Sequence, residues 1–230
     1  MTRPYLTGVL DIYAGNTGYS LPAVRDGGIV ALIHKASEGS TQTDSRFLPV
    51  MEEAHELGFL RGAYHFARSG DPVAQADRFV TIVRKAVEPE SILLALDLEG
   101  ALDLPTTMTT RDAARFVERV RELTGRWPLF YAGASKLRER ARRDPNSMQV
   151  LARCPLWLAQ YGEEPAREKI PAAFPGDGWA LWQFTNGKEG PNDQVAFPRI
   201  TAGFKRGRQD RSAWRGTVEE LRAWWATAGR

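Results

Sequence analysis

The sequence has little of the chemistry that cross-links small folds or holds metal ions. Its 230 residues include one cysteine, Cys154, and three histidines. One cysteine cannot form an internal disulfide, and it also excludes structural zinc sites built from several thiolates. The histidines show neither a His-x-His nor a His-Glu-x-x-His spacing, the patterns that would indicate catalytic zinc. We therefore expect no metal and no other cofactor.

Long hydrophobic runs are missing as well. No apolar stretch approaches the roughly 18–20 residues that span a bilayer. The first residues, MTRPYLTGVLDIY, lack the long apolar segment of a secretory signal. These absences predict no stable insertion into a membrane, and synthesis in the cytoplasm without a signal peptide.

A large excess of charge of either sign is also absent. The formal net charge is +3, with 26% charged and 43% hydrophobic residues, which is typical of a globular protein. Basic residues gather at 137–145 and 204–211, but no aromatic RNA-binding signature or zinc-finger spacing accompanies them. We expect no nucleic-acid partner, and interpret the basic segments either as solvated surface or as a contact for an anionic polymer.

The sequence does contain apolar, strand-like runs that alternate with helical patterns. Several of the runs are continuous rather than alternating, which is typical of strands buried on both faces. Seven runs are clear and an eighth is weaker: 8–13, 29–37, 60–67, 92–99, 128–133, 155–161 and 179–185, with the weaker one near 204–211.

Helical patterns separate these runs in the first two thirds of the chain, and Pro- and Gly-containing loops replace them after residue 150. This order predicts an α/β fold, a single irregular (β/α) TIM-like barrel with its helices depleted in the C-terminal half. An open, doubly wound sheet is the alternative, but no glycine-rich phosphate motif follows the first strand. We expect one domain over 1–230, no separate wall-binding domain and a monomer. The helical patterns cover 46–57, 72–87, 109–124, 134–143 and 217–227.

In the segment ILLALDLEG (92–100), a hydrophobic strand is followed by two carboxylates, Asp97 and Glu99. Side chains two positions apart on a strand face the same side, and the C-terminal ends of barrel strands are where catalytic groups gather. Two neighbouring carboxylates in a half-buried site cannot easily both ionise, so the pKa of one rises. One then donates a proton while the other stays charged, as in glycosidases. The alternative is that both pair with Arg or Lys at the rim and only hold loops.

Polar side chains also come late in the other strand-like runs. If those strands are parallel, the polar groups converge on one mouth. A metal-dependent hydrolase is an alternative, with Asp11, His34, His65 and Asp97 as ligands. Trp157 is a candidate for stacking on a sugar ring. The late polar residues are Asp11, His34, Lys35, Tyr64, His65, Tyr131, Gln160 and Gln183.

Together, the order and spacing of these segments resemble glycoside hydrolase family 25, the Chalaropsis-type lysozymes or N-acetylmuramidases. The similarity runs from about residue 8 to residue 225, and the tail is similar to the endings of phage-encoded members. It is carried by GVLDIY, ALIHKASEGSTQTDSRF, AHELGFLRGAYHFAR, LLALDLEG, PLFYAG, PLWLAQYG, WALWQFT and QDRSAWRGTVEELRAWW.

The resemblance implies roles for individual residues. Glu99 matches the general acid and Asp97 its partner carboxylate. Asp11 and Asp210 match the aspartates on the first and last strands. The resemblance also places Tyr64, Tyr131 and Gln183 in the sugar groove. Beside these three, we expect His65, Trp157, Lys35 and Glu38 to bind the substrate.

The resemblance also implies a substrate, bacterial peptidoglycan, cut at the β-1,4 bond between N-acetylmuramic acid and N-acetylglucosamine. It implies retention of configuration, with the 2-acetamido oxygen of the substrate as nucleophile and Asp97 polarising its N–H. A wall-cutting enzyme without a signal peptide fits a phage endolysin, which acts on the wall after release from the host cytoplasm. A protein that binds wall glycan without cutting it is a further alternative.

Two features depart from the family pattern. Tyr13 lies where a small hydroxyl residue is common, and a long basic segment at 188–208 precedes Asp210. The first changes the shape of the substrate site, and the second affects the match of Asp210.

Overall fold

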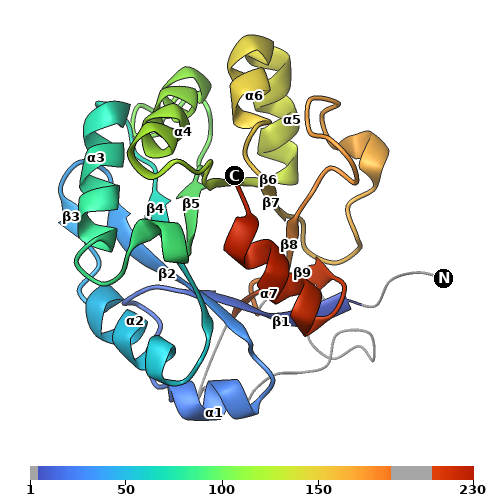
Figure 1. Ribbon diagram of the computed structural model, residues 1–230. Coiled ribbons are helices and arrows are strands. Elements are labelled where there is room, and N and C mark those ends of the chain that lie inside the picture. Colours follow the sequence, from blue (N-terminus) through green and yellow to red (C-terminus); the bar gives the residue numbers. More distant parts are fainter. Residues whose placement is uncertain (1–4, 188–208) are drawn as a thin grey trace.

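Eight strands close into a barrel in the computed structural model, which describes residues 5–187 and 209–230 (Figure 1). Seven strands run parallel to one another, and the last strand runs antiparallel to the two strands beside it. A two-residue strand, β3 (Gln42–Thr43), pairs with the edge of β2 only. Around the barrel the order is β1 (Tyr5–Ile12), β2 (Ala31–Glu38), β4 (Leu60–Phe66), β5 (Leu93–Asp97), β6 (Leu129–Gly133), β7 (Leu156–Ala159), β8 (Leu181–Thr185) and β9 (Asp210–Arg215).

The strands are hydrophobic because both of their faces are covered. All five residues of β5 are buried. Leu94 and Leu96 belong to the core between the sheet and the helices, whereas Leu93 and Ala95 belong to the cluster inside the barrel. The expected (β/α) barrel is therefore confirmed, and the open sheet is excluded because β1 also pairs with β2.

The helices cover the outside of the barrel, and the five predicted ones are present. Thr109 caps α4 by accepting a hydrogen bond from the amide of Asp112, and Gly125, with φ of 73°, ends that helix. None of the helices in the part of the chain that the structure describes is long and apolar enough to span a bilayer. The helices are α1 (Leu21–Asp26), α2 (Phe47–Glu56), α3 (Pro72–Val83), α4 (Thr110–Thr124), α5 (Ala134–Arg143), α6 (Pro145–Leu151) and α7 (Val218–Thr227).

The sequence analysis missed α1 and α6. They have six and seven residues, too few for a helical period to stand out. Each has a proline in its first turn, where the missing N–H costs no hydrogen bond. Between β7 and β8 the chain makes only a short 3₁₀ turn at Arg167–Lys169, which confirms that helices become scarce there.

The last strand lies later than predicted and runs the other way. The prediction was 204–211, whereas β9 begins at Asp210; residues 204–208, like the rest of 188–208, lie outside the described residues. Because β9 is antiparallel to β1, its first residue lies opposite Asp11 in the ladder. Asp210 therefore reaches the same mouth as the C-terminal ends of the parallel strands.

Helix α7 closes the opposite end of the barrel (Figure 1). Leu221 and Trp225 pack into the cluster inside the barrel, and the indole N–H of Trp225 donates to the carbonyl of Arg61 at 2.7 Å. The buried guanidinium of Arg126 donates to the carbonyl oxygens of Ala228, Trp225 and Ile92 at 2.7, 3.1 and 3.3 Å. This one side chain joins the end of α7 to the start of β5.

Replacement of Arg126 by methionine tests this closure. The change leaves buried carbonyl oxygens without donors, so we expect the free energy of unfolding in urea to fall by about 3 kcal/mol. The matched control is Arg222→Met on the exposed face of α7, which should change it by less than about 0.5 kcal/mol. Similar effects of the two substitutions would contradict the closing role of Arg126.

Candidate active site

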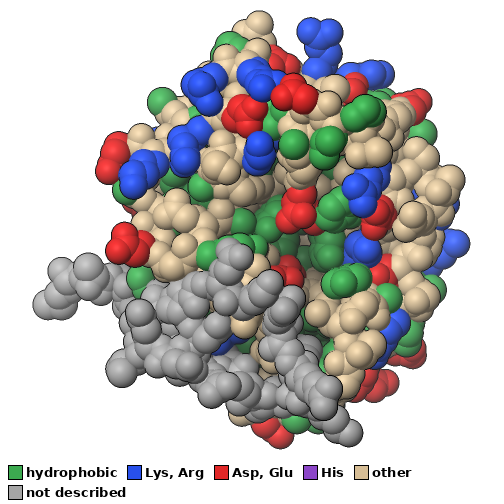
Figure 2. Space-filling view, turned by 180° about the vertical axis from the view of Figure 1, so that it is seen from behind, with side chains coloured by type: hydrophobic (Ala, Val, Ile, Leu, Met, Phe, Trp, Pro, Cys, Tyr) green, Lys and Arg blue, Asp and Glu red, His purple; other side chains and the backbone are tan. Residues whose placement is uncertain are grey.

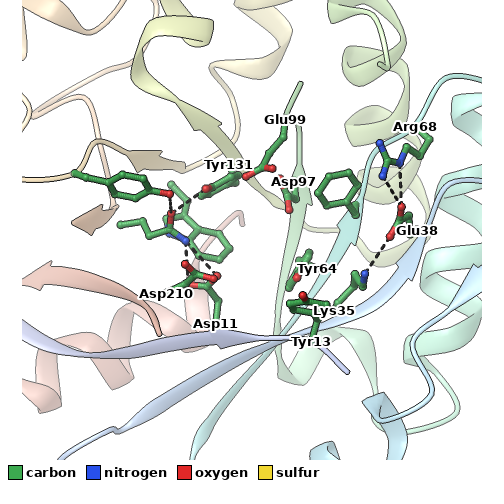
Figure 3. Close-up of a pocket in the computed structure, with 14 residues that line it drawn as sticks. Asp11, Tyr13, Lys35, Glu38, Tyr64, Arg68, Asp97, Glu99, Tyr131 and Asp210 are labelled. Atoms are coloured by element: carbon green, nitrogen blue, oxygen red, sulfur yellow. Dashed lines mark hydrogen bonds and ion pairs between the residues drawn. The ribbon is translucent and has the colours of Figure 1, made fainter. Parts of the chain in front are cut away.

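A cavity of about 270 Å³ opens at the C-terminal mouth of the barrel. In Figure 2 it is the hollow near the centre of the face, with acidic side chains inside it. Its lining comes from the inward-facing positions of the strands and from the segments that follow them (Figure 3). The lining residues are Asp11, Tyr13, Lys35, Glu38, Tyr64, Phe66, Arg68, Asp97, Glu99, Tyr131, Trp157, Tyr161, Gln183 and Asp210.

The two acids of β5 share the cavity but differ in exposure. Asp97 is the last residue of β5 and is 8% exposed, and its Oδ1 has no hydrogen-bond partner among the described residues. Beyond it, the amide of Leu98 donates to the carbonyl of Tyr131 at 3.1 Å. This bond continues the ladder past the strand, so Glu99 keeps the side of Asp97 but stands exposed at the mouth. The prediction that both acids face one cavity is confirmed.

Gln183 joins the opposite wall into a hydrogen-bonded network. Its amide nitrogen lies 3.2 Å from both carboxylate oxygens of Asp11 and donates to them. Its amide oxygen accepts from the hydroxyls of Tyr131, at 2.9 Å, and Tyr161, at 3.3 Å. Because both ends of the amide are used, the orientations of Asp11 and Tyr131 are coupled.

Four carboxyl groups of this cavity have raised pKa values. Burial raises the pKa of Asp11 and of Asp97 well above the ordinary value, and Asp210 and Glu99, respectively, add to the effect. Although the side chain of Glu99 is exposed, the protein atoms around its carboxyl group partly desolvate it and raise its pKa, and the Tyr131 hydroxyl opposes this. Burial and the charge of Glu99 raise the pKa of Asp210 to about 6. Four acids in one poorly solvated hollow do not all ionise, so the site holds protons near neutral pH.

The fifth acid, Glu38, is neutralised on the other wall. Its carboxylate accepts hydrogen bonds from Lys35 at 3.0 Å and from Arg68 at 2.9 and 2.7 Å. Burial acts to raise the pKa of Glu38, but these hydrogen bonds outweigh it and lower the pKa. Figure 3 shows this group across the cavity from Asp11 and Asp210. One wall is thus a fixed ion-pair network and the other an acidic one.

The aromatic residues divide into a floor and a rim. Trp157 is 2% exposed, its indole N–H donates to Ser212 at 2.9 Å, and Tyr131 packs edge-on against it at 4.8 Å between ring centroids. Trp157 is therefore the floor of the cavity, and the prediction that it stacks on a sugar ring does not fit its burial. The exposed aromatic surface belongs to Tyr13 and Tyr161, which are 43% and 37% exposed at the rim.

The prediction that His65 binds substrate is wrong. Successive side chains of a strand point to opposite faces, so His65 faces the helices when Tyr64 faces the cavity. Its ring is fully buried, stacks on Phe116 at 5.0 Å, and bonds Ser37 at 2.8 Å and Gln75 at 3.0 Å. Burial lowers its pKa to about 4. His65 is a neutral group that joins β4 to the helix layer.

The metal-dependent alternative fails because its four proposed ligands lie on opposite faces of the sheet. His34 packs against Phe47 of α2, outside the barrel, and His65 lies on that side too. Asp11 and Asp97 lie inside, so the four proposed ligands do not meet. Within residues 5–187 and 209–230, no group of three or more His, Cys, Asp or Glu residues is arranged to hold a metal ion.

Three lining residues were not predicted as site residues, although a periodic signal indicates them. Phe66 and Arg68 follow Tyr64 at intervals of two, and Tyr161 follows Ala159 at the same interval. Following the alternation to the end of β4 identifies Phe66, and extending it past the ends of β4 and β7 identifies Arg68 and Tyr161.

Residues 10–192 match the sequence model of the glycosyl hydrolases family 25. The chain is 26% identical over 194 residues to an autolytic lysozyme of Clostridium acetobutylicum, covering 82% of this chain and 55% of the relative. It is 30% identical over 172 residues to lysozyme M1 of Streptomyces globisporus, covering 71% of this chain and 56% of the relative. It is 26% identical over 176 residues to a lysozyme of Streptococcus phage Cp-1, covering 75% of this chain and 49% of the relative. The chain spans about half the length of these curated relatives.

The solved structures agree with the fold. The crystal structure of the bacterial lysozyme from Streptomyces coelicolor superposes with a TM-score of 0.72 at 22% identity, covering 99% of each chain. At this identity the likeness supports the barrel architecture.

The raised pKa of Asp210 predicts a pH-dependent gain in stability when this acid is neutralised. A native pKa of about 6 against an ordinary 3.8 means that the folded wild type holds a proton that the unfolded chain releases. The contribution of Asp210 to wild-type stability therefore falls as the pH rises from about 4 to about 6. We expect Asp210→Asn to be more stable than the wild type by about 2 kcal/mol above pH 7, and the difference to vanish near pH 3.

Thermal melting of both proteins between pH 3 and 8 measures this. Asp26→Asn, at the exposed end of α1, is the control and should follow the wild-type profile. If Asp210→Asn also follows that profile, the burial cost assigned to Asp210 is wrong.

Proposed function

The chain belongs to glycosyl hydrolase family 25, and from this membership and the geometry of its cavity we propose that it is a peptidoglycan hydrolase. In this proposal it cuts the β-1,4 bond between N-acetylmuramic acid and N-acetylglucosamine. The observation that carries it is the pair of acids at the end of β5. Glu99 is exposed at the mouth and has a raised pKa, and beside it the buried Asp97 has a carboxyl oxygen without a hydrogen-bond partner among the described residues.

Glu99 fits the general acid. A leaving sugar oxygen needs a proton as its bond to the anomeric carbon breaks. Glu99 is exposed at the mouth, where the glycosidic oxygen of a bound glycan can reach it, and its raised pKa keeps a proton available. The buried Asp97 is too recessed for this task.

Asp97 fits a guide for the 2-acetamido group of the substrate. Its Oδ1 is an acceptor without a partner among the described residues, so it can accept the acetamido N–H. This polarises the amide, whose carbonyl oxygen attacks the anomeric carbon as the bond to the leaving oxygen breaks and Glu99 protonates that oxygen. Water then attacks the cyclic intermediate, Glu99 takes its proton, and the two displacements retain the configuration. Substrate assistance of this kind is an alternative to an enzyme nucleophile.

The two side walls hold the reacting sugar. Hydrogen bonds through Gln183 fix Asp11 and Tyr131, so that their oxygen atoms hold set positions on one wall of the cavity. On the other wall, the ammonium of Lys35 and the guanidinium of Arg68 remain next to the cavity while they neutralise Glu38. Tyr13 and Tyr161 supply exposed rings at the rim.

Substitution of the two central acids tests the proposal. We expect Glu99→Gln to lower kcat on purified bacterial walls by about 10³-fold, because the amide cannot donate the proton. Asp97→Asn should lower it by about 10²-fold, because a carboxamide does not stabilise the positively charged amide of the substrate. The measurements are loss of turbidity and mass analysis of the released fragments, whose new reducing ends should be N-acetylmuramic acid.

Glu118→Gln, on the exposed face of α4, is the matched control and should keep wild-type turnover. If wild-type walls stay turbid with the protein bound, the chain is a glycan-binding protein and the proposal is wrong. Wild-type turnover of Glu99→Gln would remove Glu99 as the acid.

The proposed biological role is lysis of a bacterial host by a phage. Support comes from the phage lysozyme among the relatives, although a bacterial autolytic lysozyme is also among them. In this role the protein is made in the host cytoplasm and reaches the wall after the membrane has been opened.

Expression in a bacterial host with and without a membrane-permeabilising protein tests that role. We expect culture turbidity to collapse only when both proteins are made, because the wall lies outside the membrane. The same pair with Glu99→Gln should leave the culture intact. Lysis without the permeabilising protein would contradict the proposed route.

A further inference from the structure

Two further hollows continue the catalytic cavity along one side of the barrel mouth. The first, of about 440 Å³, shares Glu99, Tyr131 and Tyr161 with the catalytic cavity. The second, of about 1090 Å³, shares Ser135 and Arg138 with the first. The three hollows therefore lie side by side, in a row that begins at the acidic site and continues along α5.

The position of Glu99 determines which sugar lies in which hollow. A general acid protonates the oxygen between the reacting sugar and the leaving sugar, so the two rings lie on either side of its carboxyl group. Glu99 borders both the catalytic cavity and the first hollow. The reacting N-acetylmuramic acid lies beside Asp97, and the leaving N-acetylglucosamine occupies the first hollow. Because the two sugars alternate, the next ring along the row is again N-acetylmuramic acid, which carries a peptide stem.

The second hollow, farthest from the acids, is lined by cations that have no partner. Arg138 and Arg142 stand one turn apart on α5, and Lys169 faces them from the 3₁₀ turn between β7 and β8. In the described part of the chain, the charged side-chain group of none of the three makes an ion pair or a hydrogen bond. Figure 2 shows Lys and Arg side chains gathered above and to the left of the acidic hollow.

The carboxylates beside these cations do not cancel them. Glu139 is already paired with Lys136 at 3.0 Å and Arg143 at 2.8 Å. Glu168 is the other acid of the lining, which holds four basic side chains in all. The second hollow therefore keeps an excess of positive charge that attracts anionic groups.

A fixed apolar wall completes the second hollow. The guanidinium of Arg167 donates to the carbonyl oxygens of Ile170, Phe174 and Gly176 at 3.1, 2.7 and 2.9 Å. These bonds hold the loop whose residues 170–172 line the hollow with Ile, Pro and Ala side chains. Cations on one side and small apolar groups on the other match a short peptide that carries both carboxylates and alanine methyl groups.

We propose that the second hollow binds the peptide stem on the leaving side of the cut, with Arg142 and Lys169 contacting its free carboxylates. The proposal rests on the muramidase function above. A phosphate polymer of the wall would also be attracted to the cations, but it has no side chains for the apolar wall to contact. Continuity with the hollow of the leaving sugar further favours the stem.

The test compares glycan chains freed of phosphate polymers, with their stems intact, against the same chains after an amidase has removed the stems. The variant Arg142→Gln/Lys169→Gln alters cations that line only the second hollow. We expect its kcat/KM on stem-bearing chains to fall about tenfold, mainly through KM, and to stay within about twofold on stripped chains. The control Arg25→Gln/Arg222→Gln removes the same charge from exposed positions on α1 and α7 and should be unchanged on both substrates.

Equal losses on both substrates, or no loss, would overturn the proposal. So would a loss confined to walls that keep their phosphate polymers, which would assign the second hollow to those polymers. If the wild type releases no reducing ends from either substrate, the muramidase function itself is wrong. Calorimetric binding of stem-bearing chains then tests the second hollow separately, because the double variant should bind them more weakly than the control.

Discussion

The alternation of side chains along a closed strand is the constraint on which the rest of this molecule depends. Once the sheet closes through β1 and β2, each strand has one face toward the barrel interior and one toward the helices. The position of an inward-facing residue along its strand then decides whether its side chain packs in the core or faces the cavity. Early inward positions such as Leu93 belong to the interior cluster that also holds Leu221 and Trp225 of α7, and late ones such as Asp97 reach the mouth. Neighbours in the sequence can therefore have unrelated roles, as Tyr64 in the cavity and the buried His65 do.

The same constraint explains what the sequence alone could predict. Apolar runs and helical periods located the seven parallel strands, and the acids at 97 and 99 marked their mouth. The prediction for His65 is wrong because a position late in a strand does not fix which face a side chain takes, and His65, next to Tyr64, faces the helices. The direction of β9 was not predicted from its six residues, DRSAWR, which show neither a continuous apolar run nor a clear alternation. Trp157 was misjudged because its hydrogen bond to Ser212 spans 55 positions of the chain.

Stability and function are placed at opposite ends of the barrel. At the closed end, the guanidinium of Arg126 satisfies several buried carbonyl oxygens, and Trp225 seals the interior. At the open end, burial raises the pKa values of four carboxyl groups, and each that ionises destabilises the fold. A barrel closed firmly at one end can hold an unfavourable cluster of acids at the other.

The difference between Asp97 and Glu99 is one of depth rather than of chemical type. Both are carboxylic acids on the same side of one chain segment, and both have raised pKa values. Asp97 is the last residue of β5 and is almost inaccessible to solvent. It can therefore act only on a group that enters the hollow, such as an acetamide. Glu99 lies two positions farther out, on the wall shared with the neighbouring hollow, where a bond between two sugars can reach it. The two-residue step therefore separates a buried carboxyl group from an accessible one, which is the separation that the proposed mechanism uses for an acceptor and a proton donor.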